Sequence, residues 1–206
     1  MDVAVSVLTV IGLTGNSGSG KGYVCDLLAE NGIKSIDTDR IVHELYKNTN
    51  ECTLRLREIF GEGVFKSNGE VDRQKLGQLV FADRDALDRL NKTVHFYVER
   101  AVCSILDRLQ TSGEQIAVID APMLFESCLD KKCDVTVAVI ASQETLIERI
   151  ISRDKISSDR AIARLANQHD AEFFRKNCNF VIINDKDSDI RLSVDQLISE
   201  ITAENE

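Results

Sequence analysis

The chain has 206 residues, of which 43% are hydrophobic and 29% are charged, and its formal net charge at pH 7 is −9. This is the composition of an ordinary globular protein that can bury a core, and the length suits one domain with an insert. The negative charge disfavours binding to nucleic acid by phosphate neutralisation, so we expect no nucleic-acid partner.

An apolar run, residues 3–13, stands at the start of the chain and leads into a glycine-rich segment. It has neither the basic start nor the cleavage site of a signal peptide, so we interpret residues 5–13 as a core strand. No run in the sequence reaches the roughly 18 apolar residues of a membrane span. We therefore expect a cytoplasmic protein without a membrane partner, whose six cysteines are buried or half-buried thiols. The sequence does not set an oligomeric state.

The glycine-rich segment reads GLTGNSGSGKGYV, from Gly12 to Val24. It matches the phosphate-binding pattern G-x-x-x-x-G-K-[ST] except at the last position, where Gly22 replaces the hydroxyl residue. We expect its backbone N–H groups to surround phosphate at the start of a helix over residues 21–29, with Lys21 reaching the β- and γ-phosphates. The expected nucleotide contacts are Gly15, Gly18, Ser19, Gly20, Lys21, Gly22 and Tyr23.

Gly22 affects the expected metal site more than the nucleotide site. The usual Ser or Thr hydroxyl binds Mg²⁺, so this chain must hold the metal through another ligand, most simply a water molecule. The alternative is that the segment is only a glycine-rich turn before a helix. The preceding strand, the following helix and the register of Lys21 favour phosphate binding.

Two acids follow the next predicted strand, residues 32–37, in the sequence SIDTDR. Ligands of open α/β sheets bind at the carboxyl ends of the strands. Asp39 is therefore a candidate general base toward a hydroxyl group that attacks the γ-phosphate, or a ligand of Mg²⁺ through water. The alternative is that Asp37 or Thr38 caps a helix that begins near Ile41, which accounts for one acid only.

Residues 41–112 contain no strong strand pattern and are predicted to form a mostly helical insert. Apolar residues recur every three or four positions between Asp83 and Leu109, which predicts one long helix, and residues 61–72 form a turn-rich loop. His95 lies on the long helix, where it is either a hydrogen-bonded, partly buried side chain or a substrate contact.

A third predicted strand, residues 116–120, also ends in an acid. Asp120 occupies the position of a Walker B acid, so it is a candidate for substrate contact and for binding Mg²⁺, directly or through water. The alternative is an acid that serves only the turn at the end of the strand.

Arginines cluster between the fourth and fifth predicted strands, residues 134–140 and 179–183. Arg149 and Arg153 are four residues apart on one face of a predicted helix. They belong either to a solvated helix face or to a mobile lid over residues 145–170 that neutralises charge on a transferring phosphoryl group. The phosphate loop and the strand-end acids favour the lid.

The five predicted strands are short and nearly all apolar, which is typical of parallel strands buried on both faces. Together with the helical segments between them, they predict an α/β fold built on a doubly wound five-stranded parallel sheet. In this interpretation residues 1–40 and 113–206 form a nucleotide-binding core and residues 41–112 form the insert.

Several motifs, in order along nearly the whole chain, resemble those of the dephospho-coenzyme A kinase family. The family's GLTGGIGSGKS, IDAD, PLLFE and VIDN motifs read here GLTGNSGSGKG, SIDTDR, APMLFES and FVIIND. The resemblance implies a P-loop kinase fold. It also implies an enzyme that moves the γ-phosphoryl group of ATP to the ribose 3′-hydroxyl of dephospho-coenzyme A, with Mg²⁺ as cofactor.

The resemblance also implies roles for single residues. Asp39 matches the family's proposed base and Lys21 its phosphate-binding lysine, while Arg149 and Arg153 fall where its lid arginines fall. Asn184 lies in the stretch that resembles its adenine-side loop, and the insert would cradle the coenzyme A arm. The acceptor contacts expected are Asp39, Arg40, His95 and Asp120.

The chain departs from the family's motifs at Gly22, at Phe96, which follows His95 where the family usually has proline, and at Ile183. Two other functions remain open from the sequence, another nucleoside or nucleotide kinase and a catalytically weak nucleotide-binding protein. The strand-end acids and the lid arginines favour an enzyme, because a binding module needs none of them.

Overall fold

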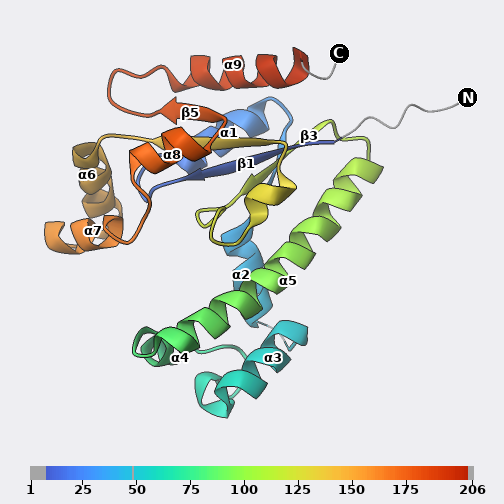
Figure 1. Cartoon of the computed structure of the whole chain (residues 1–206), viewed down its shortest axis with the longest axis vertical. Helices are drawn as coiled ribbons and strands as arrows, with labels where there is room; N and C mark the ends of the chain where they lie inside the picture. The colour runs from blue at the N-terminus through green and yellow to red at the C-terminus, as the bar shows by residue number, and fades with distance from the viewer. Residues whose placement is uncertain (1–7, 48, 204–206) are drawn as a thin grey trace, which may run out of the picture. The chain divides into compact units, whose positions relative to one another are not determined.

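The computed structural model describes residues 8–47 and 49–203. These residues form two compact units (Figure 1). The first unit contains the described chain up to Ile36 and from Leu109 onward, and the second contains Asp37–Arg108. The second unit covers nearly the same part of the chain as the predicted insert, with both boundaries slightly earlier.

A parallel sheet forms the centre of the first unit, and the described residues contribute five strands to it. Their spatial order is β2-β3-β1-β4-β5, so β1 is the central strand. This confirms the predicted α/β class, although residues 5–7 of the predicted first strand lie outside the described residues. The strands are β1 (Thr9–Gly15), β2 (Lys34–Asp37), β3 (Ile116–Asp120), β4 (Val135–Ile140) and β5 (Phe180–Ile183).

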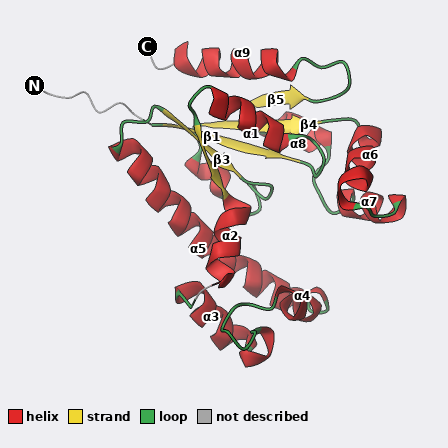
Figure 2. Cartoon of the chain, turned by 180° about the vertical axis from the view of Figure 1, so that it is seen from behind, coloured by secondary structure: helices red, strands yellow, loops and turns green. Residues whose placement is uncertain are grey.

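Helices cover both faces of the sheet, which is the doubly wound arrangement. Successive side chains of a strand point to opposite faces, so neighbouring residues of β4 enter different layers. Val137 and Val139 pack with α1 (Lys21–Glu30) and α9 (Ile190–Ala203). Ala138 and Ile140 pack with α8 (Ala171–Asn177). Figures 1 and 2 view the sheet from opposite sides, and α8 lies in front of it in Figure 1 whereas α1 lies in front of it in Figure 2. Burial on both faces explains why β3 and β4 are nearly all apolar, whereas three of the four residues of the edge strand β2 are exposed.

Two helices, α6 (Gln143–Asp154) and α7 (Ser158–Leu165), follow β4 and carry the clustered arginines. Ser142 caps α6 by accepting from the backbone N–H of Thr145, and Ser157 caps α7 in the same way through Arg160. Lys155, in the left-handed conformation with φ of 54°, ends α6 and turns the chain toward α7.

The second unit is helical, as predicted. Asn50 and Thr53 form a capping box at the start of α3 (Glu51–Phe60), and Asp72 caps α4 (Arg73–Phe81). The predicted long helix is confirmed as α5, and the turn-rich loop contains a short 3₁₀ helix, η1 (Glu62–Val64). The helices are α2 (Thr38–Lys47), α3 (Glu51–Phe60), α4 (Arg73–Phe81) and most of α5 (Arg84–Thr111). No described helix is both long enough and apolar enough to cross a lipid bilayer.

Two expectations from the sequence are corrected. The helix after β2 begins at Thr38 rather than near Ile41, because the Asp37 carboxylate accepts the backbone N–H of Arg40 at 2.9 Å and caps the helix directly after the strand. The six cysteines are free thiols, but Cys128 is exposed, since it lies in a turn with φ of 57° before η2 (Leu129–Lys132).

Candidate active site

The phosphate loop connects β1 to α1, and several of its glycines are required by geometry. Gly18 and Gly20 have φ of 84° and 93°, a region that side chains other than glycine rarely adopt. A Cβ atom at Gly15 would lie 2.2 Å from the carbonyl oxygen of Val139. The loop is therefore packed directly against the neighbouring strand β4, and its backbone enters α1 in one tight turn.

Two features of the loop suit an anionic ligand. The first turn of α1, residues 21–24, contains no acid, and no described side chain caps the helix at Gly20. Ser19 is 1% exposed, and its Oγ atom has no hydrogen-bond partner among the described residues. Uncapped N–H groups at a helix start attract anions, and a buried hydroxyl without a partner is unfavourable. A phosphate group would satisfy both.

Lys21 and Asp120 form an ion pair beside the loop, between Lys21 Nζ and Asp120 Oδ1. Lys21 is the first residue of α1, and Asp120 ends β3 directly opposite Leu13 of β1. The two side chains are only 15% and 17% exposed, so each charge depends on the other for stabilisation. The structure thus brings the predicted lysine and the predicted strand-end acid together.

Cys25 lies next to this ion pair and was missed by the sequence analysis. Burial, followed by the negative charge of Asp120, raises the pKa of the Cys25 thiol to about 12. The thiol therefore stays protonated at neutral pH, where it can donate a hydrogen bond to the carboxylate. Its spacing of four residues from Lys21 in a helix was the available signal, because such residues share one face.

Arg149 and Asn184 bind the loop through its carbonyl groups. Arg149 Nη1 donates to the carbonyl oxygens of Gly18 at 3.2 Å and Ser19 at 3.4 Å, and Nη2 donates to Asn184 Oδ1 at 3.1 Å. Asn184, which is 7% exposed directly after β5, donates from Nδ2 to the Ser19 carbonyl at 2.7 Å. Both residues therefore help to fix the conformation of the loop.

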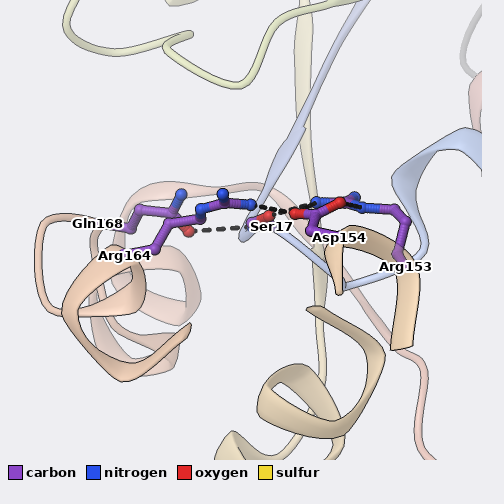
Figure 3. Close-up of polar contacts among 5 residues, drawn as sticks. All are labelled: Ser17, Arg153, Asp154, Arg164 and Gln168. Carbon is purple, nitrogen blue, oxygen red and sulfur yellow. Dashed lines mark hydrogen bonds and ion pairs between the residues drawn. The ribbon is translucent and has the colours of Figure 1, made fainter. Parts of the chain in front are cut away.

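Arg153 reaches the loop at another point. Its Nη2 atom donates to Ser17 Oγ at 3.0 Å (Figure 3). Ser17 and its neighbour Asn16 were also missed, because the sequence shows no local pattern for contacts between residues more than 130 positions apart.

A pocket of about 380 Å³ lies beside the start of α1. It is lined by Tyr23 and by residues 186–191, which follow β5. Tyr23 is 47% exposed, so its ring is available for contact with a planar ligand group.

The remaining predicted site residues, Asp39, Arg40 and His95, belong to the second unit. Asp39 is the second residue of α2, where a negative charge favours the helix start, and Arg40 follows it with an exposed side chain. His95 is half-buried on α5, which suits either of its two interpretations. The same unit contains a pocket of about 360 Å³ whose lining includes Tyr97 and Arg100.

Residues 9–189 match the family model described as dephospho-CoA kinase. The chain belongs to the dephospho-CoA kinase family. It is 34% identical to the dephospho-CoA kinase of Bacillus licheniformis over 186 residues. The alignment covers 89% of this chain and 92% of the relative. These matches confirm the resemblance that the loop and strand-end motifs indicated.

Solved structures agree with this assignment. TT1252 from Thermus thermophilus is 29% identical, with a TM-score of 0.78 over 95% of this chain and 97% of that one. A dephospho-CoA kinase from Campylobacter jejuni is 25% identical, with a TM-score of 0.62 over 94% and 97% of the two chains. Both structures therefore share the fold of this chain over nearly its whole length.

Proposed function

We propose that this chain transfers the γ-phosphoryl group of ATP to the ribose 3′-hydroxyl of dephospho-coenzyme A, giving coenzyme A. The match of residues 9–189 to the dephospho-CoA kinase model carries the proposal. The Lys21–Asp120 pair beside a glycine loop supports it, because a kinase needs a cation for phosphate and an acid at the strand end. ATP and dephospho-coenzyme A are its proposed small-molecule partners, and a cytoplasmic location stays a prediction.

The phosphate loop is the proposed site for the ATP phosphates. Lys21 would exchange Asp120 for the β- and γ-phosphate oxygens, and Ser19 Oγ would gain the hydrogen-bond partner that its burial requires. The adenine base would occupy the pocket beside Tyr23. Asn184, whose amide donates to the Ser19 carbonyl, is proposed to contribute to the adenine side of the same site.

The metal-binding residues fit Mg²⁺ only when a nucleotide is bound as well. No group of three or more acids, cysteines or histidines within the described residues is arranged to hold a metal ion. Proteins usually bind Mg²⁺ with one or two carboxylates together with substrate phosphates and water, and Asp120 can supply the carboxylate. When bound, Mg²⁺ neutralises charge that develops on the phosphate oxygens.

Asp39 is the proposed general base toward the acceptor hydroxyl. Its neighbour Asp37 already has a structural role as the cap of α2, whereas Asp39 lies one step further, in the first turn of that helix. Arg149 and Arg153 are proposed to stabilise charge on the transferring group, and Arg40 and His95 to contact the acceptor. The second unit, with its pocket near Tyr97, would hold the coenzyme A arm.

An acceptor panel tests the proposal. We expect ADP release and a product 80 Da heavier (the mass of one added phosphoryl group) when the protein is incubated with ATP, Mg²⁺ and dephospho-coenzyme A. The 3′-deoxy analogue of dephospho-coenzyme A is the matched control, because it lacks only the attacking oxygen. Equal transfer to nucleosides or to the 3′-deoxy analogue would contradict the proposed acceptor, and ATP binding without any transfer would indicate a nucleotide-binding protein.

The variant Gly22→Ser is expected to tighten the apparent affinity for Mg²⁺. Gly22 is exposed on α1, and a Cβ atom there would meet no heavy atom of the described residues within 4 Å, so the hydroxyl fits without strain. A serine here supplies the metal ligand that the glycine lacks. The measurement is a Mg²⁺ titration of ATP-dependent turnover.

Gly22→Ala is the matched control for this prediction. It removes the helix penalty of glycine, about 1 kcal/mol at most, without adding a hydroxyl. Identical titrations of the serine and alanine variants would mean that the metal does not depend on this position.

A further inference from the structure

Asn16 and Ser17 bind the turn that follows α7. The Asn16 amide donates to the His169 carbonyl at 2.7 Å and to Gln168 Oε1 at 3.4 Å, and the Ser17 backbone N–H donates to the same Oε1 atom at 3.0 Å. Asn16 is only 9% exposed, so these bonds replace contacts with water. The family motif has glycine and isoleucine at these two positions, which offer no polar side chain.

Ser17 also binds the end of α6, through Arg153 (Figure 3). The guanidinium group of Arg153 holds the Asp154 carboxylate with two bonds, from Nε to Oδ1 at 2.7 Å and from Nη2 to Oδ2 at 3.0 Å. Arg164 of α7 donates to the same carboxylate. Figure 3 shows the side chains meeting at Ser17 and Asp154, with Gln168 bonded to Ser17 from the other side.

These bonds fix the plane of the Arg153 guanidinium and leave its Nη1 nitrogen available to donate to a ligand. A two-bond contact with a carboxylate sets the orientation of an arginine, and the bond to Ser17 sets its position beside the loop. Within the described ranges, Nη1 of Arg153 makes no hydrogen bond. The side chain is 57% exposed, so a ligand can reach that group.

The charge of this cluster suits an anionic ligand. Arg153 and Arg164 together carry two positive charges and Asp154 one negative charge, which leaves one net positive charge. The two arginines also hold the pKa of the Asp154 carboxyl well below its usual range. Asp154 therefore stays ionised throughout the pH range in which a kinase is assayed.

We propose that Ser17 and Asp154 are positioning residues for Arg153, holding its guanidinium group beside the phosphate loop so that Nη1 binds an oxygen of the transferring phosphoryl group. Fixed donors aimed at developing charge act most strongly in the transition state. The hydrogen bonds of Asn16 and Gln168 keep the turn after α7 attached to the same loop. The inference rests on the proposed function, because it takes the anion to be a phosphate of ATP.

Single variants test the positioning role. Ser17→Ala removes the acceptor of the Arg153 bond, and Asp154→Asn replaces one of the two oxygens that hold the arginines. We expect each to lower kcat about 10-fold, with a smaller change in the KM for ATP and an unchanged Tm. Ser17→Thr, which keeps the hydroxyl, is expected to retain wild-type kcat. Ser152→Ala, at an exposed position next to Arg153, and Asp159→Asn, an exposed acid of α7, are the matched controls.

A double-mutant cycle separates positioning from a general structural effect. If Ser17 acts only through Arg153, then Ser17→Ala has no further effect on kcat once Arg153→Ala is present. Additive losses in the double variant, or wild-type kcat in Ser17→Ala, would overturn the inference. A fall in Tm in proportion to the loss of kcat would assign Ser17 a purely structural role, which also overturns it.

The same cycle is measured without an acceptor, as calorimetric affinity for ATP. Non-additive losses of affinity at Ser17 and Arg153 would support the inference even if dephospho-coenzyme A proved not to be phosphorylated. Conversely, wild-type transfer to dephospho-coenzyme A with an additive cycle would retain the proposed function and reject the positioning role.

Discussion

Asp39→Asn is expected to bind ATP as the wild type does and to lose about 10²- to 10⁴-fold in kcat with dephospho-coenzyme A. The acceptor hydroxyl must give up its proton as its oxygen bonds to phosphorus, and an amide cannot accept that proton. The change keeps the size of the side chain and removes a charge that favours the start of α2, worth about 0.5 kcal/mol. Steady-state kinetics, calorimetry of ATP binding and thermal unfolding measure the three quantities.

Asp37→Ala is the control for this variant, because the two acids are separated only by Thr38. Asp37 caps α2 through the Arg40 N–H, so its loss is expected to reduce the free energy of unfolding by about 1 kcal/mol while kcat changes little. The opposite pattern, with kcat lost in Asp37→Ala and kept in Asp39→Asn, would show that Asp37 rather than Asp39 is the base. Unfolding of Asp39→Asn would make that acid structural.

Lys21→Ala is expected to weaken ATP binding by about 100-fold or more, and transfer should be lost with it. The lysine is the cation of the loop that can reach both the β- and the γ-phosphate. The variant also removes the charge that neutralises Asp120, whose side chain is 17% exposed, so a loss of stability on the order of 1–3 kcal/mol is expected. Calorimetry with ATP measures the affinity, and thermal unfolding measures the stability.

Lys34→Ala is the matched control for the lysine. Lys34 lies on the edge strand β2, is 57% exposed and pairs with Glu114, so its removal is expected to leave the affinity for ATP unchanged. An equal affinity in Lys21→Ala and the wild type would mean that the loop is only a turn.

The sheet could be predicted from the sequence because its physical cause is local. Strands buried on both faces, such as β3 and β4, are apolar at nearly every position. Apolar residues at intervals of three and four predicted the long amphipathic helix α5. The start of α2 could not be predicted to the residue, because Asp37 and Thr38 are both good caps and the choice depends on where β2 ends.

The contacts that fix the loop could not be predicted, because their partners are distant in the sequence. Arg149 was selected as an arginine on a helix face, but nothing near it indicates that it donates to the Gly18 carbonyl. In the same way, nothing near Ser17 indicates that its hydroxyl accepts a hydrogen bond from Arg153. Such pairs follow from the tertiary fold and leave no periodic signal.

The Lys21–Asp120 ion pair also bears on the order in which ligands are taken up. Inorganic phosphate must compete with Asp120 for the lysine, and Mg²⁺ must compete with Lys21 for the carboxylate, so each ion alone is disfavoured. In the proposed function, a nucleotide that binds Lys21 would release the Asp120 carboxylate for the metal. By thermodynamic linkage, the factor by which the nucleotide would raise the affinity for the metal equals the factor by which the metal would raise the affinity for the nucleotide. With the proposed function, we therefore expect the ion pair to favour the magnesium complex of ATP over inorganic phosphate or Mg²⁺ alone.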